Sequence, residues 1–210
     1  MDTEERFKKA IARIDEENSK DPNRIMYKDE EYPKELLYSR HMTDWLHKIN
    51  PDASIELQLA ARSQHICRWM SPRDSYPMDR IGYLKWRTDL KNFHAQKTAG
   101  ILSECGFDKT AVDRVSSLIR KEKVKTDPES QLLEDVVCLV FLENYFIDFY
   151  AKHKEDKVID IVRKTWKKMS PKGQEVALEL ELSDAAKGIV EKAMEKLWEE
   201  VSESTAMIFY

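Results

Sequence analysis

The sequence has little of what a sheet protein or a secreted scaffold needs. Only 5 glycines and 7 prolines occur in 210 residues, so few positions favour tight turns. The three cysteines, Cys67, Cys105 and Cys138, form no Cys-x-x-Cys pair, which favours reduced thiols in a cytoplasmic protein and leaves a nuclear one open. The charged N-terminal residues do not resemble a signal peptide, and no apolar run approaches about 18 residues. We therefore expect no membrane partner.

Excess charge of one sign is also missing. The chain has 35 Lys and Arg residues against 39 Asp and Glu residues, a net charge of −4, so we expect no nucleic-acid partner. Any anion site must be a local cluster of cations. Charged residues make up 35% of the chain and apolar residues 41%, a balance that favours long amphipathic helices. The composition predicts an all-α, single-domain helical bundle.

Hydrophobic periodicity predicts a series of helices and one strongly apolar, central helix. We expect a main domain over residues 1–180, and over 181–210 an amphipathic helix and a greasy tail that packs on the same domain. The expected helices cover residues 7–14, 34–49, 52–69, 79–105, 109–122 and 125–153, followed by two or three closing helices around the joint "KKMSPKGQE".

Three polar residues, His41, His65 and Asp135, lie on helices whose pattern predicts burial. A buried, ionised carboxylate is costly, so Asp135 needs a cation or strong hydrogen-bond donors nearby. Two neutral imidazoles and a carboxylate from three helices would suit one divalent metal, for which Mn, Fe, Zn and Mg are the candidates. The alternative is a set of hydrogen-bonded core residues, with Asp135 paired to Arg62 or Lys97. Spacing leaves both interpretations open.

Two further residues are candidates for proton transfer. His94, on the helix predicted over residues 79–105, is a fourth metal ligand or a general acid or base. Glu134 precedes Asp135 and points about a quarter-turn away on a helix, so we expect only one of the two to face the centre.

Cations gather close to His65. We expect Arg62, Arg68, Arg73 and Lys97 to bind a small anionic substrate, because guanidinium groups are the usual bidentate partners of phosphate and carboxylate. Tyr76, Tyr83 and Trp86 are candidates for stacking on a ring of that substrate. The alternative is that these cations form solvated pairs with Asp and Glu residues.

The order of these residues resembles a known superfamily. An early helical histidine, a histidine in "LQLAARSQHI" and an acidic residue in "SQLLEDVVCLVFLE" resemble the HD-domain superfamily. Its members are all-helical, metal-dependent phosphohydrolases, with a minority of diiron oxygenases. The segments "SRHMTDWL", "AARSQHICRW", "YLKWRTDLKNFHA", "LLEDVVCLVFLENYF" and "RKTWKKMSPKG" resemble more closely a family of uncharacterised bacterial and fungal proteins, classed as a domain of unknown function. That second resemblance covers nearly the whole chain.

The resemblance to HD enzymes implies roles for single residues. His41 matches the first ligand histidine, His65 the histidine of the His-Asp pair, and Asp135 the late aspartate. Ile66 stands where those enzymes carry a metal-binding aspartate. The resemblance therefore implies a single-metal site, or a site that has lost its metal.

Three functions follow as hypotheses. The first is a divalent-metal-dependent hydrolase of a small phosphorylated or nucleotide-like compound, with metal-bound water as the nucleophile and His94 or Glu134 moving protons. The second is a non-haem iron oxygenase on the same fold. The third is a catalytically degenerate binding or scaffold protein, for which the C-terminal helix offers a partner surface. Whether the chain is an enzyme and whether it forms a homodimer stay open.

Overall fold

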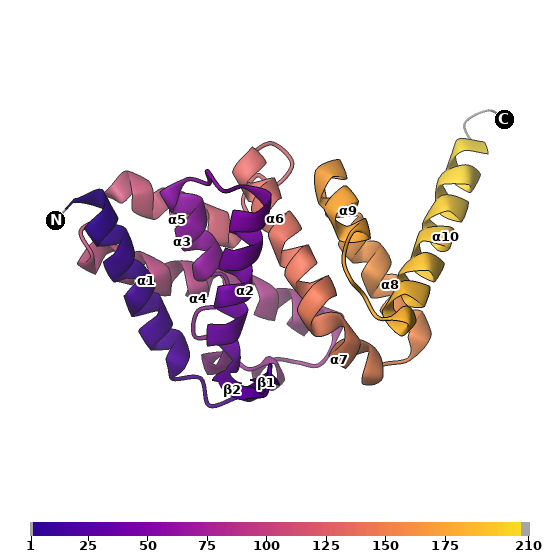
Figure 1. Cartoon of the computed structure of the whole chain (residues 1–210), viewed down its shortest axis with the longest axis horizontal. Helices are drawn as coiled ribbons and strands as arrows, with labels where there is room; N and C mark the ends of the chain where they lie inside the picture. Colours follow the sequence, from indigo (N-terminus) through magenta and orange to yellow (C-terminus); the bar gives the residue numbers. More distant parts are fainter. Residues whose placement is uncertain (1, 207–210) are drawn as a thin grey trace. The chain divides into compact units, whose positions relative to one another are not determined.

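The fold is all-α apart from one short hairpin, as the composition predicts (Figure 1). The computed structural model describes the backbone of residues 2–206 and the side chains of residues 2–197. By its contacts the chain divides into two compact units, Met1–Leu133 and Glu134–Tyr210, and the boundary falls within α6 (Pro128–Val140). The domain division predicted at residue 180 stays a prediction, and the predicted tail at residues 207–210 lies outside the described part.

The first unit holds five helices, the hairpin, two short 3-10 turns and the start of α6. These elements are α1 (Thr3–Ser19), β1 (Arg24–Tyr27), β2 (Glu30–Pro33), α2 (Lys34–Ile49), α3 (Ile55–Arg62), η1 (Arg68–Met70), η2 (Arg73–Ser75), α4 (Arg80–Glu104) and α5 (Lys109–Arg120). The helix α1 packs on α2, α3 and α4, and α5 packs on α3 and α4.

Short polar side chains set where these helices begin. Ser54, Asp79 and Asp108 each accept a hydrogen bond from the backbone N–H three positions on, which satisfies one of the free donors of a helix start. The predicted end of α4 is confirmed at Gly106, whose φ of +85° favours glycine. The Phe107 N–H then donates to the Leu102 carbonyl at 3.1 Å and closes the helix end.

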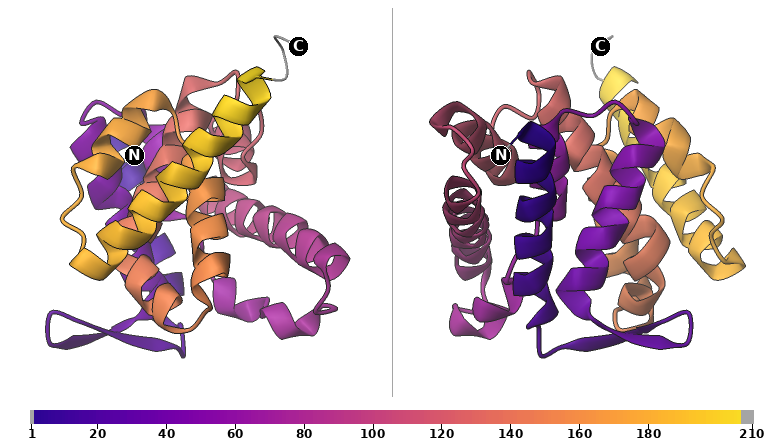
Figure 2. Two further views of the ribbon diagram at one scale, coloured as in Figure 1. Left: turned by 90° about the vertical axis from the view of Figure 1, so that its right-hand side faces the viewer. Right: turned by 60° about the vertical axis from the view of Figure 1, so that its left-hand side comes forward.

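The hairpin was not predicted. Strands β1 and β2 pair in antiparallel register, with Tyr27 opposite Glu30, and lie between the end of α1 and the start of α2 (Figure 2, right). The two turn residues, Lys28 and Asp29, both have positive φ, as a tight two-residue hairpin turn requires. Glycine and asparagine usually mark such turns, and their absence here hides the hairpin in the sequence.

The helix predicted through Trp69 is wrong beyond Arg62, where α3 ends. The chain then forms tight turns, and Cys67 adopts a left-handed φ of +54°. The backbone N–H of Cys67 donates to the Asn18 side-chain oxygen at 3.1 Å, which fixes this turn against α1. His65 therefore lies in a turn after α3 and not on the face of a helix.

The long helix α4 has the predicted bounds to within about one residue. Its buried side includes Trp86, Leu90, His94 and Ile101, whereas Tyr83, which was expected on the same side, is exposed. This register turns His94 toward the interior of the first unit.

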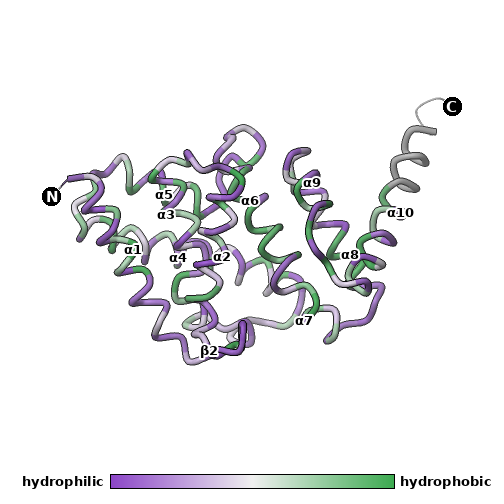
Figure 3. Tube along the Cα trace, in the orientation of Figure 1, coloured by the Kyte–Doolittle hydropathy of each residue, from purple (hydrophilic) through white to green (hydrophobic). Residues whose placement is uncertain are grey.

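The described part of the second unit consists of the rest of α6, a π-helical turn and four helices. Their bounds are η3 (Phe141–Tyr145), α7 (Phe146–Ala151), α8 (Glu155–Trp166), α9 (Pro171–Leu178) and α10 (Asp184–Ala206). Figure 3 shows that α6 is mostly hydrophobic, in agreement with the predicted apolar segment. The core of the second unit forms where α7, α8 and α10 meet, around Phe146, Val162 and Ile189. Among the described residues, no helix is both long and apolar enough to cross a bilayer.

The buried carboxylate of Asp135 organises the predicted joint between α8 and α9. It accepts hydrogen bonds from the Ser170 backbone N–H at 2.8 Å and from the Ser170 hydroxyl at 2.6 Å. Ser170 in turn caps α9 by accepting from the Gly173 N–H at 3.1 Å. A negative charge at a helix N-terminus is also favoured by the helix dipole. Asp135 thus receives the strong donors that its burial requires.

Gly173 leaves the space that Asp135 occupies. A Cβ atom on residue 173 would lie 2.7 Å from the Asp135 Cγ atom, so Gly173→Ala must displace the carboxylate or the helix. We expect Gly173→Ala to lower the free energy of unfolding by about 1–3 kcal/mol in urea titrations. Gly188→Ala is the matched control, because nothing lies within 4 Å of its Cβ position, and it should raise stability by about 0.5–1 kcal/mol. Equal effects of the two substitutions would contradict this role of Gly173.

Candidate functional site

Polar side chains from three parts of the first unit meet around His65. The Nδ1 atom of His65 lies 3.3 Å from the Glu35 Oε2 atom, and its Nε2 atom lies 3.2 Å from an Arg68 Nη atom. The Tyr38 ring stacks on the His65 ring at 3.9 Å between centroids, and the His94 ring lies 6.0 Å away. We refer to Glu35, Tyr38, His65, Arg68 and His94 as the His65 cluster.

The neighbours of His65 determine where its proton sits. Arginine only donates, so the Nε2 atom of His65 must be the acceptor of the Arg68 N–H group. The proton of a neutral ring is then on Nδ1, directed at the Glu35 carboxylate. A carboxylate on one nitrogen and a lone pair on the other is the arrangement that lets an imidazole act as a base.

Burial and surrounding charge keep His65 neutral. Burial holds the pKa of His65 well below its usual value, and Arg68, Lys121, Lys34 and Arg87 lower that pKa further. Burial also raises the pKa of Glu35, whereas Arg68 acts in the opposite direction. The side chain of His65 is still 25% exposed, so a small molecule can reach it.

His94 lies deeper than His65 and has one free nitrogen. Its Nδ1 atom donates to the Ile66 carbonyl at 2.7 Å, and its Nε2 atom has no hydrogen-bond partner among the described residues. Only 1% of His94 is exposed. Burial, with a smaller effect from His65, lowers the pKa of His94 to about 3. His94 is therefore a second neutral imidazole with a free lone pair.

The three predicted metal ligands have partners within their own units. His41, on α2, packs its ring against the Tyr27 ring, with 5.0 Å between the centroids. His65 faces a carboxylate and a guanidinium, and Asp135, in the second unit, accepts from Ser170. Within the described range, no group of three or more His, Cys, Asp or Glu side chains is placed to hold a metal ion.

The quarter-turn between Glu134 and Asp135 predicts that only one of the two faces the site, and this stays a prediction. Both residues are buried and belong to the second unit, whereas His94, the other candidate for proton transfer, belongs to the first.

Three of the four predicted anion-binding cations are engaged by the first unit itself. Arg62 forms two hydrogen bonds with Asp15, at 2.7 and 2.6 Å, and Lys97 contacts Glu17 at 2.9 Å. Arg73 donates to backbone carbonyls, including that of Pro77 at 2.7 Å. The alternative pairing of Arg62 or Lys97 with Asp135 stays a prediction, and both cations have carboxylate partners on α1. Arg68 is the predicted cation that joins the His65 cluster.

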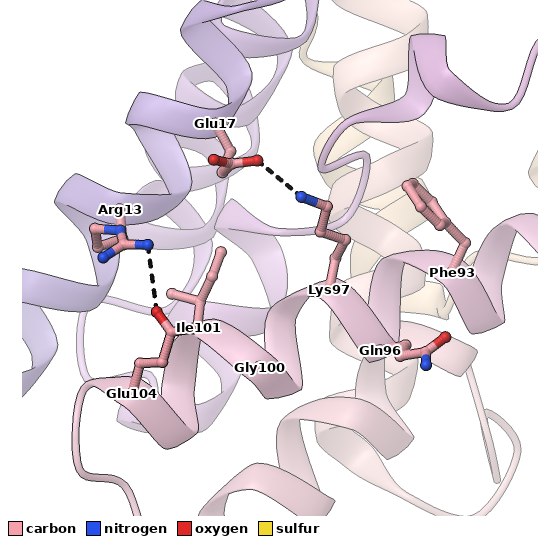
Figure 4. A pocket seen from close by; sticks show the side chains of 8 residues that line it. All are labelled: Arg13, Glu17, Phe93, Gln96, Lys97, Gly100, Ile101 and Glu104. Atoms are coloured by element: carbon pink, nitrogen blue, oxygen red, sulfur yellow. Dashed lines mark hydrogen bonds and ion pairs between the residues drawn. The ribbon is translucent and has the colours of Figure 1, made fainter.

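A separate groove of about 370 Å³ lies between α1 and α4. Figure 4 shows the Glu17–Lys97 and Arg13–Glu104 ion pairs that cross it. Charges of both signs line this groove and are matched within it. We therefore place the candidate site at His65, where a carboxylate and a guanidinium meet one partly exposed imidazole.

Sequence reasoning missed Glu35, Tyr38 and Lys34. All three lie in the first turns of α2, and the periodicity drew attention to His41 on the next turn instead. The sequence does contain one signal for Glu35, which directly precedes two leucines, Leu36 and Leu37. All three residues are buried in the structure.

The low pKa of His94 predicts how stability depends on pH. The pKa of His94 is about 3 in the folded chain, whereas a free imidazole has a pKa of about 6.5. Between these values the unfolded chain binds a proton that the folded chain excludes, so the free energy of unfolding falls as pH drops, by about 1.4 kcal/mol per pH unit. The low pKa of His65 acts in the same direction, and the raised pKa of Glu35 acts in the opposite one.

The variant His94→Asn isolates this effect, because an asparagine amide can still donate to the Ile66 carbonyl. Between about pH 7 and about pH 5, we expect the variant to lose less stability than the wild type in urea titrations. His47→Asn is the control, since His47 is an exposed histidine of α2. Parallel pH profiles for the wild type and His94→Asn would rule out a neutral, buried His94.

Comparison with known proteins places the chain in a family. Neither the curated proteins nor the solved structures gave a match. A family model described as "Domain of unknown function (DUF4202)" matches residues 8–190, which include every residue of the His65 cluster. The match confirms the predicted relation to an uncharacterised family, and the distant likeness to HD-domain enzymes stays a prediction. The chain belongs to the DUF4202 family.

Proposed function

We propose that the chain hydrolyses a small phosphorylated or nucleotide-like compound bound at the His65 cluster. The observation that supports this proposal is the charge around one partly exposed, neutral imidazole. Arg68, Lys121, Lys34 and Arg87 all act on His65, and their positive potential favours an anion at that place. Glu35 is the carboxylate paired with His65, and burial separates it from bulk water.

Arg68 is the group proposed to bind the anion. Its guanidinium lies over the Trp86 ring at 5.1 Å, so its edge is left to hydrogen-bond. In the free protein that edge donates to the Nε2 atom of His65. A phosphate group is a stronger acceptor than a neutral imidazole, so the bound anion would draw the guanidinium toward itself. The Nε2 lone pair of His65 would then be free.

His65 is proposed to take the proton of the attacking water. The water oxygen forms a bond to phosphorus while the ester P–O bond breaks, and the water proton passes to the His65 Nε2 atom. The Glu35 carboxylate stabilises the imidazolium that forms, as a carboxylate does on the far nitrogen of other catalytic histidines. The leaving oxygen then takes this proton from the His65 Nε2 atom, which restores the neutral ring and releases an alcohol and phosphate.

The metal expected from the HD resemblance fits the described donor set poorly. A divalent cation on the Nε2 atom of His65 would need the position that the Arg68 guanidinium holds at 3.2 Å. The proposed steps therefore use only residues of the chain. The divalent metal, the non-haem iron oxygenase and the proton-transfer role of Glu134 stay predictions.

A binding protein without catalysis is the second candidate. It is favoured by the engagement of Arg62, Arg73 and Lys97 within the fold, which leaves Arg68 as the predicted cation at the site. Such a protein would bind phosphate compounds through Arg68 and release them unchanged.

The test is phosphate release from a panel of phosphomonoesters and nucleotides, with and without added Mg, Mn, Fe or Zn. We expect His65→Ala to lower kcat by about 100-fold or more, because general base catalysis is lost. Glu35→Gln should lower kcat with little change in KM. Arg68→Gln should raise KM about tenfold, because it removes a charge-assisted hydrogen bond to the anion.

The control for these variants is His47→Ala, which should keep the wild-type kcat and KM. Circular dichroism must show folded protein in every variant. Retained activity of His65→Ala would refute the assignment. If calorimetry shows that phosphate compounds bind through Arg68 but none is hydrolysed, the second candidate is the correct one.

A further inference from the structure

Exposed hydrophobic side chains are concentrated in one short segment of the first unit. Of the eight large hydrophobic residues that the described part of the chain exposes, five lie between residues 70 and 84. Met78 is 77% exposed, Ile81 78% and Leu84 54%. Ile81 and Leu84 are one helical turn apart on α4, and Met78 comes directly before that helix. We call Met78, Ile81 and Leu84 the α4 patch.

The α4 patch rests on a backbone that is held in place. Asp79 caps α4 by accepting from the Gly82 N–H at 2.7 Å, and Arg73 donates to the Pro77 carbonyl at 2.7 Å. Pro77 lies so close to Gly82 that a Cβ atom on residue 82 would come within 2.1 Å of the Pro77 oxygen. The exposure of the patch therefore belongs to a fixed local structure and does not arise from a frayed helix end. A preorganised apolar surface of this kind is typical of a binding surface.

The charge around the α4 patch differs from that of the whole chain. Residues 68–91 contain six Lys and Arg residues and three Asp residues, a local net charge of +3, whereas the whole chain carries −4. Arg80 and Lys85 are exposed beside the patch, where Lys85 also pairs with Asp89 at 2.7 Å, and Arg87 is half-buried. Figure 2 (left) shows the start of α4 at the outer edge of the first unit. A partner for this surface needs an apolar stripe with acidic residues beside it.

Two other occupants fit less well. A symmetric contact between two copies of this chain would bring the same basic rims together, which costs free energy. A bilayer binds in proportion to the apolar area that it buries, and the three side chains of the α4 patch offer little of it. Mixed charges with a positive excess around methionine and aliphatic side chains suit an acidic protein segment better.

We infer that the α4 patch, with its rim of Arg80, Lys85 and Arg87, is a docking surface for an acidic amphipathic helix of another protein. The apolar stripe of that helix covers Met78, Ile81 and Leu84, and its carboxylates pair with the rim. The apolar part of this interaction uses no residue of the His65 cluster. Arg87 belongs both to the rim and to the cations that act on His65.

The test uses the full chain and two labelled peptides of about 18 residues, or five helical turns. Both peptides carry leucine at positions i, i+3, i+4 and i+7, and one has glutamate and the other lysine on the polar face. Fluorescence anisotropy should give a Kd at least about tenfold lower for the acidic peptide, and added salt should raise it.

Substitutions locate the contact. Ile81→Asp and Leu84→Asp should each weaken binding of the acidic peptide by about tenfold or more. Leu178→Asp is the matched control, because Leu178 is also an exposed leucine, at 67%, but lies on α9 in the second unit. Circular dichroism checks that each variant is folded.

Four results would overturn the inference. The first is that the two peptides bind equally or that neither binds, and the second is that binding of the acidic peptide survives Ile81→Asp. The third is self-association in analytical ultracentrifugation that Ile81→Asp abolishes, since the occupant would then be a second copy. The fourth is co-sedimentation with vesicles of phosphatidylcholine and phosphatidylserine in place of peptide binding.

Discussion

A buried carboxylate must be met by hydrogen-bond donors, and each unit of this chain contains such a group. In the second unit, Asp135 receives the backbone N–H and the hydroxyl of Ser170, and this pair fixes the start of α9. In the first unit, Glu35 lies against the imidazole of His65, which is linked in turn to Arg68. Asp135 is met by the neutral donors of a residue that also caps α9. Glu35 is met by a partly exposed imidazole that is linked to a guanidinium, so the same physical requirement brings ionisable groups to the surface.

The two carboxylates differ in the kind of group that meets them. The donors at Asp135 come from a helix start and are part of the fold. At Glu35, the partner imidazole is linked to Arg68, whose flat face rests on Trp86 while its edge makes the hydrogen bond. In the proposed function this edge exchanges the His65 nitrogen for an anion, so that the proposed site combines a fixed base with a movable cation.

Much of the fold could be predicted from the sequence, because helix caps and apolar periodicity are local signals. Asp79 and Gly106 mark the two ends of α4, and Ser170 marks the joint before α9. The end of α3 could not be predicted in this way. It depends on Asn18, which accepts from the Cys67 backbone N–H across 49 positions of the chain. The hairpin was missed for a different reason, since Lys28 and Asp29 take up positive φ without the usual glycine.

The candidate site was predicted in part. His65 was identified because a histidine is unusual on an apolar helix face, Arg68 because cations gather close to His65, and His94 as a candidate for proton transfer on the next helix. Glu35 was not, because a glutamate in the first turn of a helix usually lies in solvent and complements the helix dipole. Which cation meets which carboxylate depends on packing between elements far apart in sequence. Arg62 and Lys97 both found partners on α1, a helix that sequence reasoning had given no part in the site.

The hydrogen bond between Asn18 and Cys67 also has a consequence for how His65 is held. It joins α1 to the turn that carries His65. The residues of the His65 cluster lie between positions 35 and 94, and Asn18 lies outside that range. The orientation of His65 therefore depends on α1, a helix that contributes no side chain to the cluster.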